Sequence, residues 1–361
     1  ASAIKEISLN VHSTATAARD AAEAAGVPKI PDFNTGDNEG VGYFRVNQRN
    51  GWRMNTAKAF LRTTDSDTLR VETHAHVTGL IFEGRKVVGV AYEQGGQPRE
   101  ARCGGDVILS AGAVNSPQLL QLSGIGPAEA LRAHGIEVRH DAPGVGGNLQ
   151  DHLQLRCAWR LTGAKTLNQM ANSLMGKLAI GLEYVARRTG PMSMAPSQLG
   201  AFAKSREGLA TPDVEFHVQP LSLDAFGQPL HSYPAITASV CNLRPESRGT
   251  IRLASNDPKD APVIAPNYLS TEGDRRVAVD SIRLSRRIMT QGAMARYAPE
   301  EVKPGAAYQT DAEVAQAAGD VGTTIFHPVG TVRMGLDEAA PLDAECRMKG
   351  LDGLRVVDAS V

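Results

Sequence analysis

The sequence predicts a mixed fold, α/β plus α+β, in which an α/β lobe is interleaved with a lobe built on an antiparallel sheet. An apolar strand at 106–110 enters a small-residue turn and then a helix, the order typical of the ligand-facing edge of a parallel sheet. The segments VEFHVQPL, AITASVCNL and GTIRLAS follow one another from residue 214 to about residue 253, separated by turn residues, and indicate antiparallel strands. The composition changes near residue 151, which marks a domain boundary.

The first elements are a helix and a long connection. Residues 13–26 predict the helix, with Ser13 or Thr14 as its cap and Gly26 at its end. Residues 32–56 are polar and rich in glycine, so we expect a long irregular connection there.

Alternating apolar and polar residues then predict a small β-meander at 68–97. Residues Glu83 to Lys86 form its expected hairpin turn. Further along, we expect short helices at 115–122 and 127–138, an amphipathic helix at 166–189 and a basic-faced helix at 274–289. The chain closes on an apolar strand, GLRVVDASV, that enters a turn.

The bulk composition excludes several classes of partner. Apolar residues make up 42% of the 361 residues and charged residues 21%, with a net charge of −1 and no block of like charge. Neither nucleic acid nor an anionic membrane is favoured, so a small neutral or weakly polar ligand is expected. No apolar run reaches the length of a bilayer span and no signal-peptide pattern opens the chain, which predicts a soluble, cytoplasmic protein.

Cysteine and histidine spacing gives no metal site. None of Cys103, Cys157, Cys241 and Cys346 forms a CxxC pair, which is typical of reduced thiols in the cytosol. His74 and His76 lie two residues apart on a predicted strand, and two ligands are too few to define a metal site.

The segment from Gly112 to Gly126, GAVNSPQLLQLSGIG, contains a glycine turn and a helix N-terminus. Asn115 or Ser116 is placed to cap this helix, with Pro117 at its first position. The unpaired N–H groups of such an end favour an anion or a polar ring edge. Taken alone, the pattern also fits an ordinary strand–helix turn.

Two further segments carry histidines. His327 lies in IFHPVGTVRMG at 325–335, beside a proline and a glycine turn, and taken alone it also fits a buried structural role. Asp151 and His152 end the glycine-rich crossing GVGGNLQDH, where capping and hydrogen bonding are the expected roles.

Together these segments resemble the glucose–methanol–choline (GMC) oxidoreductases. Residues 112–126 are similar to that family's second signature position for position, and residues 144–152 resemble the passage from its flavin domain to its substrate domain. The segment around His327 resembles the catalytic-histidine motif, and VVDASV resembles the strand whose turn approaches the flavin. The resemblance extends from about residue 26 to the end of the chain.

The resemblance implies FAD as cofactor and the oxidation of a small-molecule alcohol to an aldehyde or ketone. His327 is implied as the general base, because an imidazole with an ordinary pKa near 6.5 can accept the hydroxyl proton while hydride passes to flavin N5. Six residues are implied to contact the cofactor: Val77, Ala111, Gly112, Asn115, Asp358 and Ala359.

The resemblance also implies a division of the chain into four segments. Residues 1–62 form a helix and a lid or connection segment, and 152–327 form a substrate-binding domain. Residues 63–151 and 328–361 form the two parts of an incomplete FAD-binding lobe.

The sequence departs from the family in two respects. No GxGxxG turn occurs in it, and the partner expected for the catalytic histidine, a His or Asn beyond Val361, is absent. We therefore expect a fragment that is inactive and binds FAD weakly or not at all.

Three readings of function stay open. The first is a choline dehydrogenase-like oxidoreductase, the second a non-catalytic ligand-binding module, and the third a GMC-type lyase that keeps FAD structurally. A hydrolase is disfavoured because no GxSxG elbow occurs. The alcohol, the oligomeric state and the choice between oxidase and dehydrogenase are not specified by the sequence.

Overall fold

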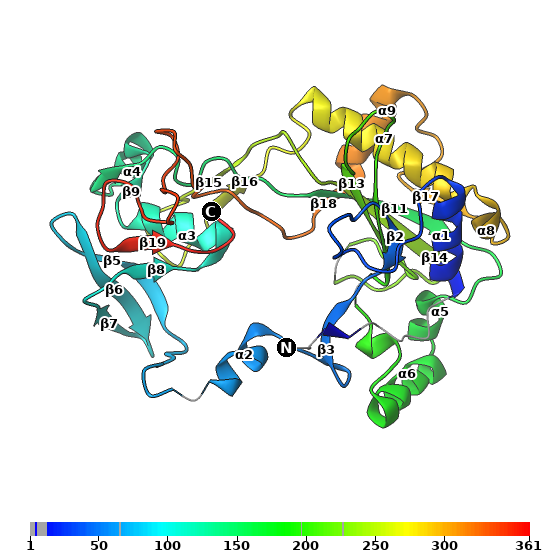
Figure 1. The fold of residues 1–361 in the computed structure, drawn as a ribbon, viewed down its shortest axis with the longest axis horizontal. Helices are drawn as coiled ribbons and strands as arrows, with labels where there is room; N and C mark the ends of the chain where they lie inside the picture. The colour runs from blue at the N-terminus through cyan, green and yellow to red at the C-terminus, as the bar shows by residue number, and fades with distance from the viewer. Residues whose placement is uncertain (1–3, 6–12, 65, 196, 226) are drawn as a thin grey trace. The chain divides into compact units, whose positions relative to one another are not determined.

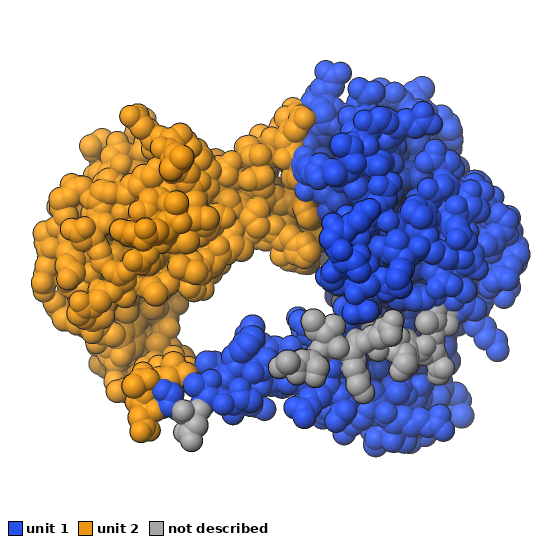
Figure 2. Space-filling model, in the orientation of Figure 1, with its two compact units in different colours: residues 1–66, 153–244, 272–323 blue, residues 67–152, 245–271, 324–361 orange. Residues whose placement is uncertain are grey.

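The computed structural model describes residues 4–5, 13–64, 66–195, 197–225 and 227–361. The chain forms two compact units, coloured separately in Figure 2. Unit 1 comprises residues 1–66, 153–244 and 272–323, and unit 2 comprises 67–152, 245–271 and 324–361. Both units are therefore assembled from segments that are far apart in the sequence.

Unit 1 is organised around a mainly antiparallel sheet of seven strands (Figure 1). The structure confirms antiparallel strands at Val214–Gln219 and Ala235–Asn242, which pair with each other. The third segment predicted there, at 249–255, belongs to unit 2 and pairs in another sheet. The strand order of the seven-stranded sheet is β17-β11-β14-β13-β12-β2, and β18 also pairs with β11. The bounds are β2 Gly40–Tyr43, β11 Leu153–Arg160, β12 Leu199–Ala203, β13 Val214–Gln219, β14 Ala235–Asn242, β17 Glu300–Lys303 and β18 Gly322–Thr324.

Helices α1 (Ser13–Ala24) and α7 (Glu272–Met289) pack on one face of this sheet. The small side chains of Ala18 and Ala22 from α1 meet Ile288 and Met289 from α7 and the apolar face of β12–β14 around a small cavity. Alternation along each strand therefore places polar side chains on the opposite face. Helix α7 matches the expected basic-faced helix, and α1 the expected first helix.

The prediction of a long irregular connection at 32–56 is wrong in part, because this segment contains β2, β3 (Val46–Arg49) and β4 (Trp52–Arg53). β2 is rich in glycine, which lowers its intrinsic strand preference, and its order comes from pairing with β12. A Cβ on Gly42 would lie 2.7 Å from the carbonyl oxygen of Ile30, so this close approach requires glycine.

The prediction of one continuous helix at 166–189 is also wrong, because the structure has two helices there, α5 (Leu167–Asn172) and α6 (Leu174–Arg187). Ser173 separates them with an extended backbone, and its hydroxyl accepts a hydrogen bond from the N–H of Gly176 at 2.9 Å. An N-cap residue of this type starts a new helix, which explains the break. The other short elements of this unit are β1 Ile4–Lys5, α2 Thr56–Ala59, the 3₁₀ turns Leu61–Thr63 and Pro191–Ser193, α8 Gly292–Ala295 and α9 Asp311–Val321.

Unit 2 combines a meander with a short parallel pair. The meander consists of β5 (His76–Glu83), β6 (Lys86–Gln94) and β7 (Gln97–Arg102), and Gly84 has a φ of +61° in the expected hairpin turn. Residues 68–75, which we expected to begin the meander, lie outside its strands.

The parallel strand expected at 106–110 is β8 (Val107–Leu109), which pairs with β19 (Leu354–Val356). Helix α3 (Gly112–Leu122) follows β8 directly. The remaining elements of unit 2 are α4 Ala128–Ala133, β9 Ile125–Gly126, β10 His140–Asp141, β15 Thr250–Arg252 and β16 Val263–Ala265.

A continuous apolar core joins the segments of unit 2. Its fully buried side chains include Val87 of β6, Leu120 of α3, Val356 of β19, and Leu342, which lies before β19. Residues 245–271 belong to this unit, whereas the sequence-based division counts them with 152–327. Backbone hydrogen bonds between Leu149 and Gly249, at 2.9 and 3.0 Å, attach this segment to unit 2.

Within the described parts of the chain, no helix has the length and apolar character needed to cross a membrane.

Candidate functional site

Helix α3 begins three residues earlier than the sequence indicates. Its first residue is Gly112, so neither Asn115 nor Ser116 caps it, and Pro117 lies inside the helix rather than at its first position. Proline has no N–H to donate to the carbonyl four residues back, which here belongs to Ala113. The buried hydroxyl of Thr331 donates to that carbonyl oxygen instead, at 2.6 Å, and this compensation allows the helix to start at Gly112.

Asp358 joins the start of α3 to the turn after β19. Its carboxylate accepts hydrogen bonds from the backbone N–H of Gly112 at 2.8 Å and from the hydroxyl of Ser116. The backbone N–H and hydroxyl of Ser360 donate to the other carboxylate oxygen at 2.8 and 2.6 Å. Partial burial raises the pKa of Asp358, but these hydrogen bonds outweigh it, and the pKa lies below its usual range.

His327 lies on an exposed loop that follows β18. Its backbone N–H donates to the buried carboxylate of Asp151 at 3.0 Å. The hydroxyls of Tyr268 and Thr324 donate to the second oxygen of the same carboxylate. Asp151 therefore has the hydrogen-bonding role that the sequence predicts for it.

Two further ring-bearing residues, His152 and Tyr268, take part in the contacts around the His327 loop. The rings of His152 and His327 meet edge to face, with centroids 5.8 Å apart. Burial and the neighbouring Asp151 carboxylate raise the pKa of Tyr268, so its hydroxyl remains a donor. Sequence reasoning missed Tyr268 and Thr324, because nothing in their local pattern links them to a residue more than a hundred positions away.

The loop that carries His327 is tied to the turn that carries Asp358. The N–H of Gly330 donates to the carbonyl of Ala359 at 3.2 Å, and the N–H of Val332 donates to the carbonyl of Ser360 at 2.6 Å. The structure thus brings Gly112, Asp358 and Ala359 into one hydrogen-bonded framework with the His327 loop. Val77, in contrast, lies on β5, where it packs against the apolar core of unit 2.

The start of α3 has the features of a site for a polar ring edge. Ala111 and Asn115 are exposed there, and a Cβ added to Gly112 would meet no atom within 4 Å. Helix N-termini present N–H groups to negatively polarised atoms, and a helix that follows a parallel strand is where dinucleotides bind. These residues therefore fit one side of an FAD site.

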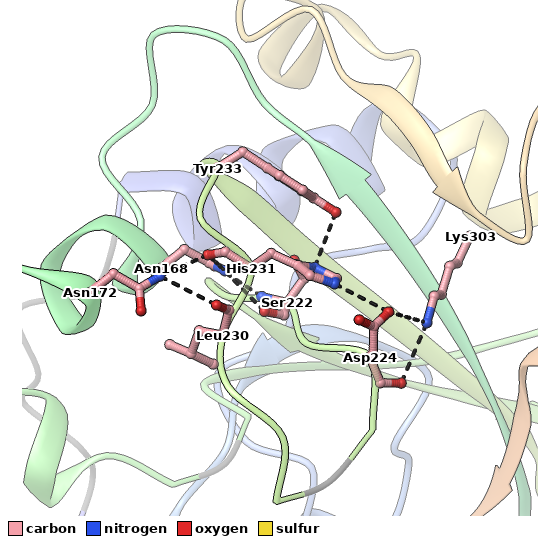
Figure 3. Close-up of polar contacts among 8 residues, drawn as sticks. All are labelled: Asn168, Asn172, Ser222, Asp224, Leu230, His231, Tyr233 and Lys303. Carbon is pink, nitrogen blue, oxygen red and sulfur yellow. Dashed lines mark hydrogen bonds and ion pairs between the residues drawn. The ribbon is translucent and has the colours of Figure 1, made fainter.

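A second polar cluster, shown in Figure 3, lies in unit 1 on the connection between β13 and β14. The Nδ1 atom of His231 lies 2.8 Å from the hydroxyl of Ser222 and 3.1 Å from that of Tyr233. Its Nε2 atom lies 3.3 Å from Asp224, which also pairs with Lys303. Ser222 is fully buried, so no substrate can reach its hydroxyl, and the cluster holds the connection in place.

Comparison with known proteins gives the family. GMC oxidoreductase family profiles match residues 3–154 and 245–361. An alcohol dehydrogenase [acceptor] of Pseudomonas putida is 40% identical over 336 residues, which cover 91% of this chain and 60% of that protein. An oxygen-dependent choline dehydrogenase of Chromohalobacter salexigens is 39% identical, covering 95% of this chain and 62% of that protein.

A solved structure also has a fold similar to that of this chain. A formate oxidase from Aspergillus oryzae, studied for modification of its FAD, superposes with a TM-score of 0.88 at 25% identity, covering 97% of this chain and 66% of that chain. The chain belongs to the GMC oxidoreductase family. It spans about 60% of the length of the Pseudomonas putida relative.

Proposed function

We propose that the protein carrying this chain oxidises an alcohol to an aldehyde or ketone with FAD as cofactor. Family membership supports this proposal, as do relatives named alcohol dehydrogenase and choline dehydrogenase. The observation that carries it is the connected framework in unit 2, in which the His327 loop and the start of α3 share the turn Asp358–Ala359.

In this proposal His327 is the general base. Oxidation of an alcohol removes the hydroxyl proton and a hydride from the adjacent carbon; bound FAD supplies the hydride acceptor. The imidazole of His327 accepts the proton, and Asp151 fixes the loop through the backbone N–H of His327. General-base catalysis of this kind contributes about 10²–10⁴-fold in rate.

The start of α3 is the proposed cofactor contact of this chain. Ala111, Gly112 and Asn115 would approach the flavin, with Asp358 and Ala359 on the adjoining turn. Val77 is the proposed contact for the adenine end. Because the sequence has no GxGxxG turn, we expect these 361 residues to hold FAD weakly by themselves.

The two units have different proposed roles. Unit 2 contains every proposed cofactor contact and His327, so we assign it to the flavin lobe. Unit 1 offers an antiparallel sheet with one polar face, which suits a small polar substrate. We propose an alcohol as the substrate class, and choline-like alcohols are the first candidates because of the names of the relatives.

The test is the anaerobic addition of alcohols, choline included, to the flavin-loaded protein. Loss of the oxidised flavin absorption on addition of an alcohol is the expected result. A flavin that binds and stays oxidised with every alcohol would contradict the proposal and favour a lyase. If the protein that carries this chain, rather than these 361 residues by themselves, takes up no flavin, a ligand-binding module would be favoured.

A further inference from the structure

The polar face of the unit 1 sheet contains three side chains of metal-ligating type. Glu215 and His217 lie two residues apart on β13, so their side chains share a face. Cys241 of β14 is the direct cross-strand partner of Glu215. One ligand atom from each of these residues lies within 4.8 Å of the other two.

The distances within this cluster suit one small cation. The Nε2 atom of His217 lies 3.4 Å from Oε1 of Glu215. Ligands bound tetrahedrally at about 2.0–2.3 Å from a zinc ion lie about 3.3–3.8 Å from one another. The Cys241 sulfur lies within 4.8 Å of both other ligand atoms and contacts the backbone carbonyl of Glu215 at 3.7 Å. The register of the strands places these side chains on the same face.

Two polar atoms of the cluster are buried and have no hydrogen-bond partner among the residues that the structure describes. They are Nε2 of His217 and the hydroxyl of Ser239, the cross-strand partner of His217. Ser239 is 1% exposed, and a buried polar atom without a partner costs about 1–3 kcal/mol. A metal ion bound by His217, with a metal-bound water beside Ser239, would satisfy both atoms.

We propose that Glu215, His217 and Cys241 bind one zinc ion, with a water molecule as fourth ligand. A thiolate, an imidazole and a carboxylate together favour zinc over magnesium or calcium, which prefer oxygen ligands. On binding, the Cys241 thiol loses its proton to solvent as the zinc–sulfur bond forms, and the two negative charges of Glu215 and Cys241 balance the ion.

The ring of His217 is already held in place for this role. It stacks on Phe44 with centroids 5.4 Å apart and an interplanar angle of 29°. A Cβ on Gly200, the cross-strand partner of His217 on β12, would lie 2.2 Å from the Phe44 ring. Glycine at this position therefore lets Phe44 lie over the strand and restrict the imidazole.

Cobalt(II) and zinc(II) chloride titrations of the full chain test the proposal. One equivalent of cobalt should produce thiolate-to-cobalt charge-transfer absorption, and zinc should displace it. Cys241→Ser should abolish this absorption, while Cys103→Ser, at an exposed thiol, should leave it unchanged. Absence of the absorption at saturating cobalt, or its persistence in Cys241→Ser, would overturn the proposal.

Two further variants keep the test decisive if Cys241→Ser does not fold. His217→Gln and Glu215→Gln keep the side-chain size and should weaken zinc binding by at least about tenfold, measured by competition with a chromophoric chelator. His76→Gln, at an exposed histidine in unit 2, is the matched control. Zinc affinity equal to that of the parent in both Glu215→Gln and His217→Gln would refute the assignment.

Discussion

The carboxylate of Asp151 accepts a hydrogen bond from the backbone N–H of His327, 176 positions further along the chain, at 3.0 Å. The two residues come from segments on either side of residues 153–323 in the sequence, and both belong to unit 2. Asp151 is 7% exposed, so its carboxylate oxygens depend on the three donors around them. Asp151 therefore fixes the position of the proposed base without touching its imidazole.

Asp151→Ala should destabilise the protein by about 2–4 kcal/mol. The substitution leaves the hydroxyls of Tyr268 and Thr324 and the N–H of His327 without this acceptor, and each of these partly buried hydrogen bonds contributes about 0.5–1.5 kcal/mol. Urea unfolding measures the free energy. Asp67→Ala, at an exposed carboxylate of the same unit, should change it by less than about 0.5 kcal/mol, and equal losses in the two variants would show that Asp151 has no anchoring role.

Thr331→Val should destabilise unit 2 by about 1–3 kcal/mol, because the carbonyl of Ala113 would lose the hydroxyl donor that takes the place of the missing Pro117 N–H. Thr331→Ser keeps the hydroxyl and is the matched control. Thermal unfolding followed by circular dichroism compares the two. If the valine and serine variants unfold at the same temperature, the Thr331 hydroxyl does not compensate for the N–H that Pro117 lacks.

Asp358 should make stability depend on pH in the acid range. Its pKa is lowered in the folded protein, so its contribution is fully present above the unfolded-state value near 3.9 and is lost as pH falls through the lower folded value. Asp358→Asn should therefore reduce stability at neutral pH and flatten its fall below about pH 4.

The measurement for Asp358 is the free energy of unfolding in urea at a series of pH values. Asp352→Asn, at an exposed carboxylate on the neighbouring turn, should retain the pH dependence of the parent. An Asp358→Asn variant with the parent's dependence would mean that Asp358 titrates alike in the folded and unfolded states.

The sequence predicted what depends on local pattern. Helices α1 and α7, the turn at Gly84 and the strand before α3 follow from periodicity and turn chemistry. It failed where tertiary contacts decide: β2 exists because it pairs with β12, and α3 starts early because Thr331 serves the carbonyl opposite Pro117.

The same limit applies to the sites. The segment around His327 was singled out by its resemblance to a family motif, whereas its residues alone also fitted a buried structural histidine. The anchoring of its loop through Asp151, Tyr268 and Thr324 requires the fold. The sequence predicted no metal site, because Cys241 is 24 positions from His217 and joins it only through the register of β13 and β14.

Anaerobic stopped-flow reduction by an alcohol of the flavin-loaded protein that carries this chain tests most directly whether His327 accepts the alcohol proton. His327→Ala should slow flavin reduction by about 10²–10⁴-fold while the spectrum of the bound flavin stays similar. His152→Ala, at the neighbouring ring, should retain a rate close to the parent's and lose mainly stability. Reduction of His327→Ala at the parent rate, or its abolition by His152→Ala alone, would contradict the account.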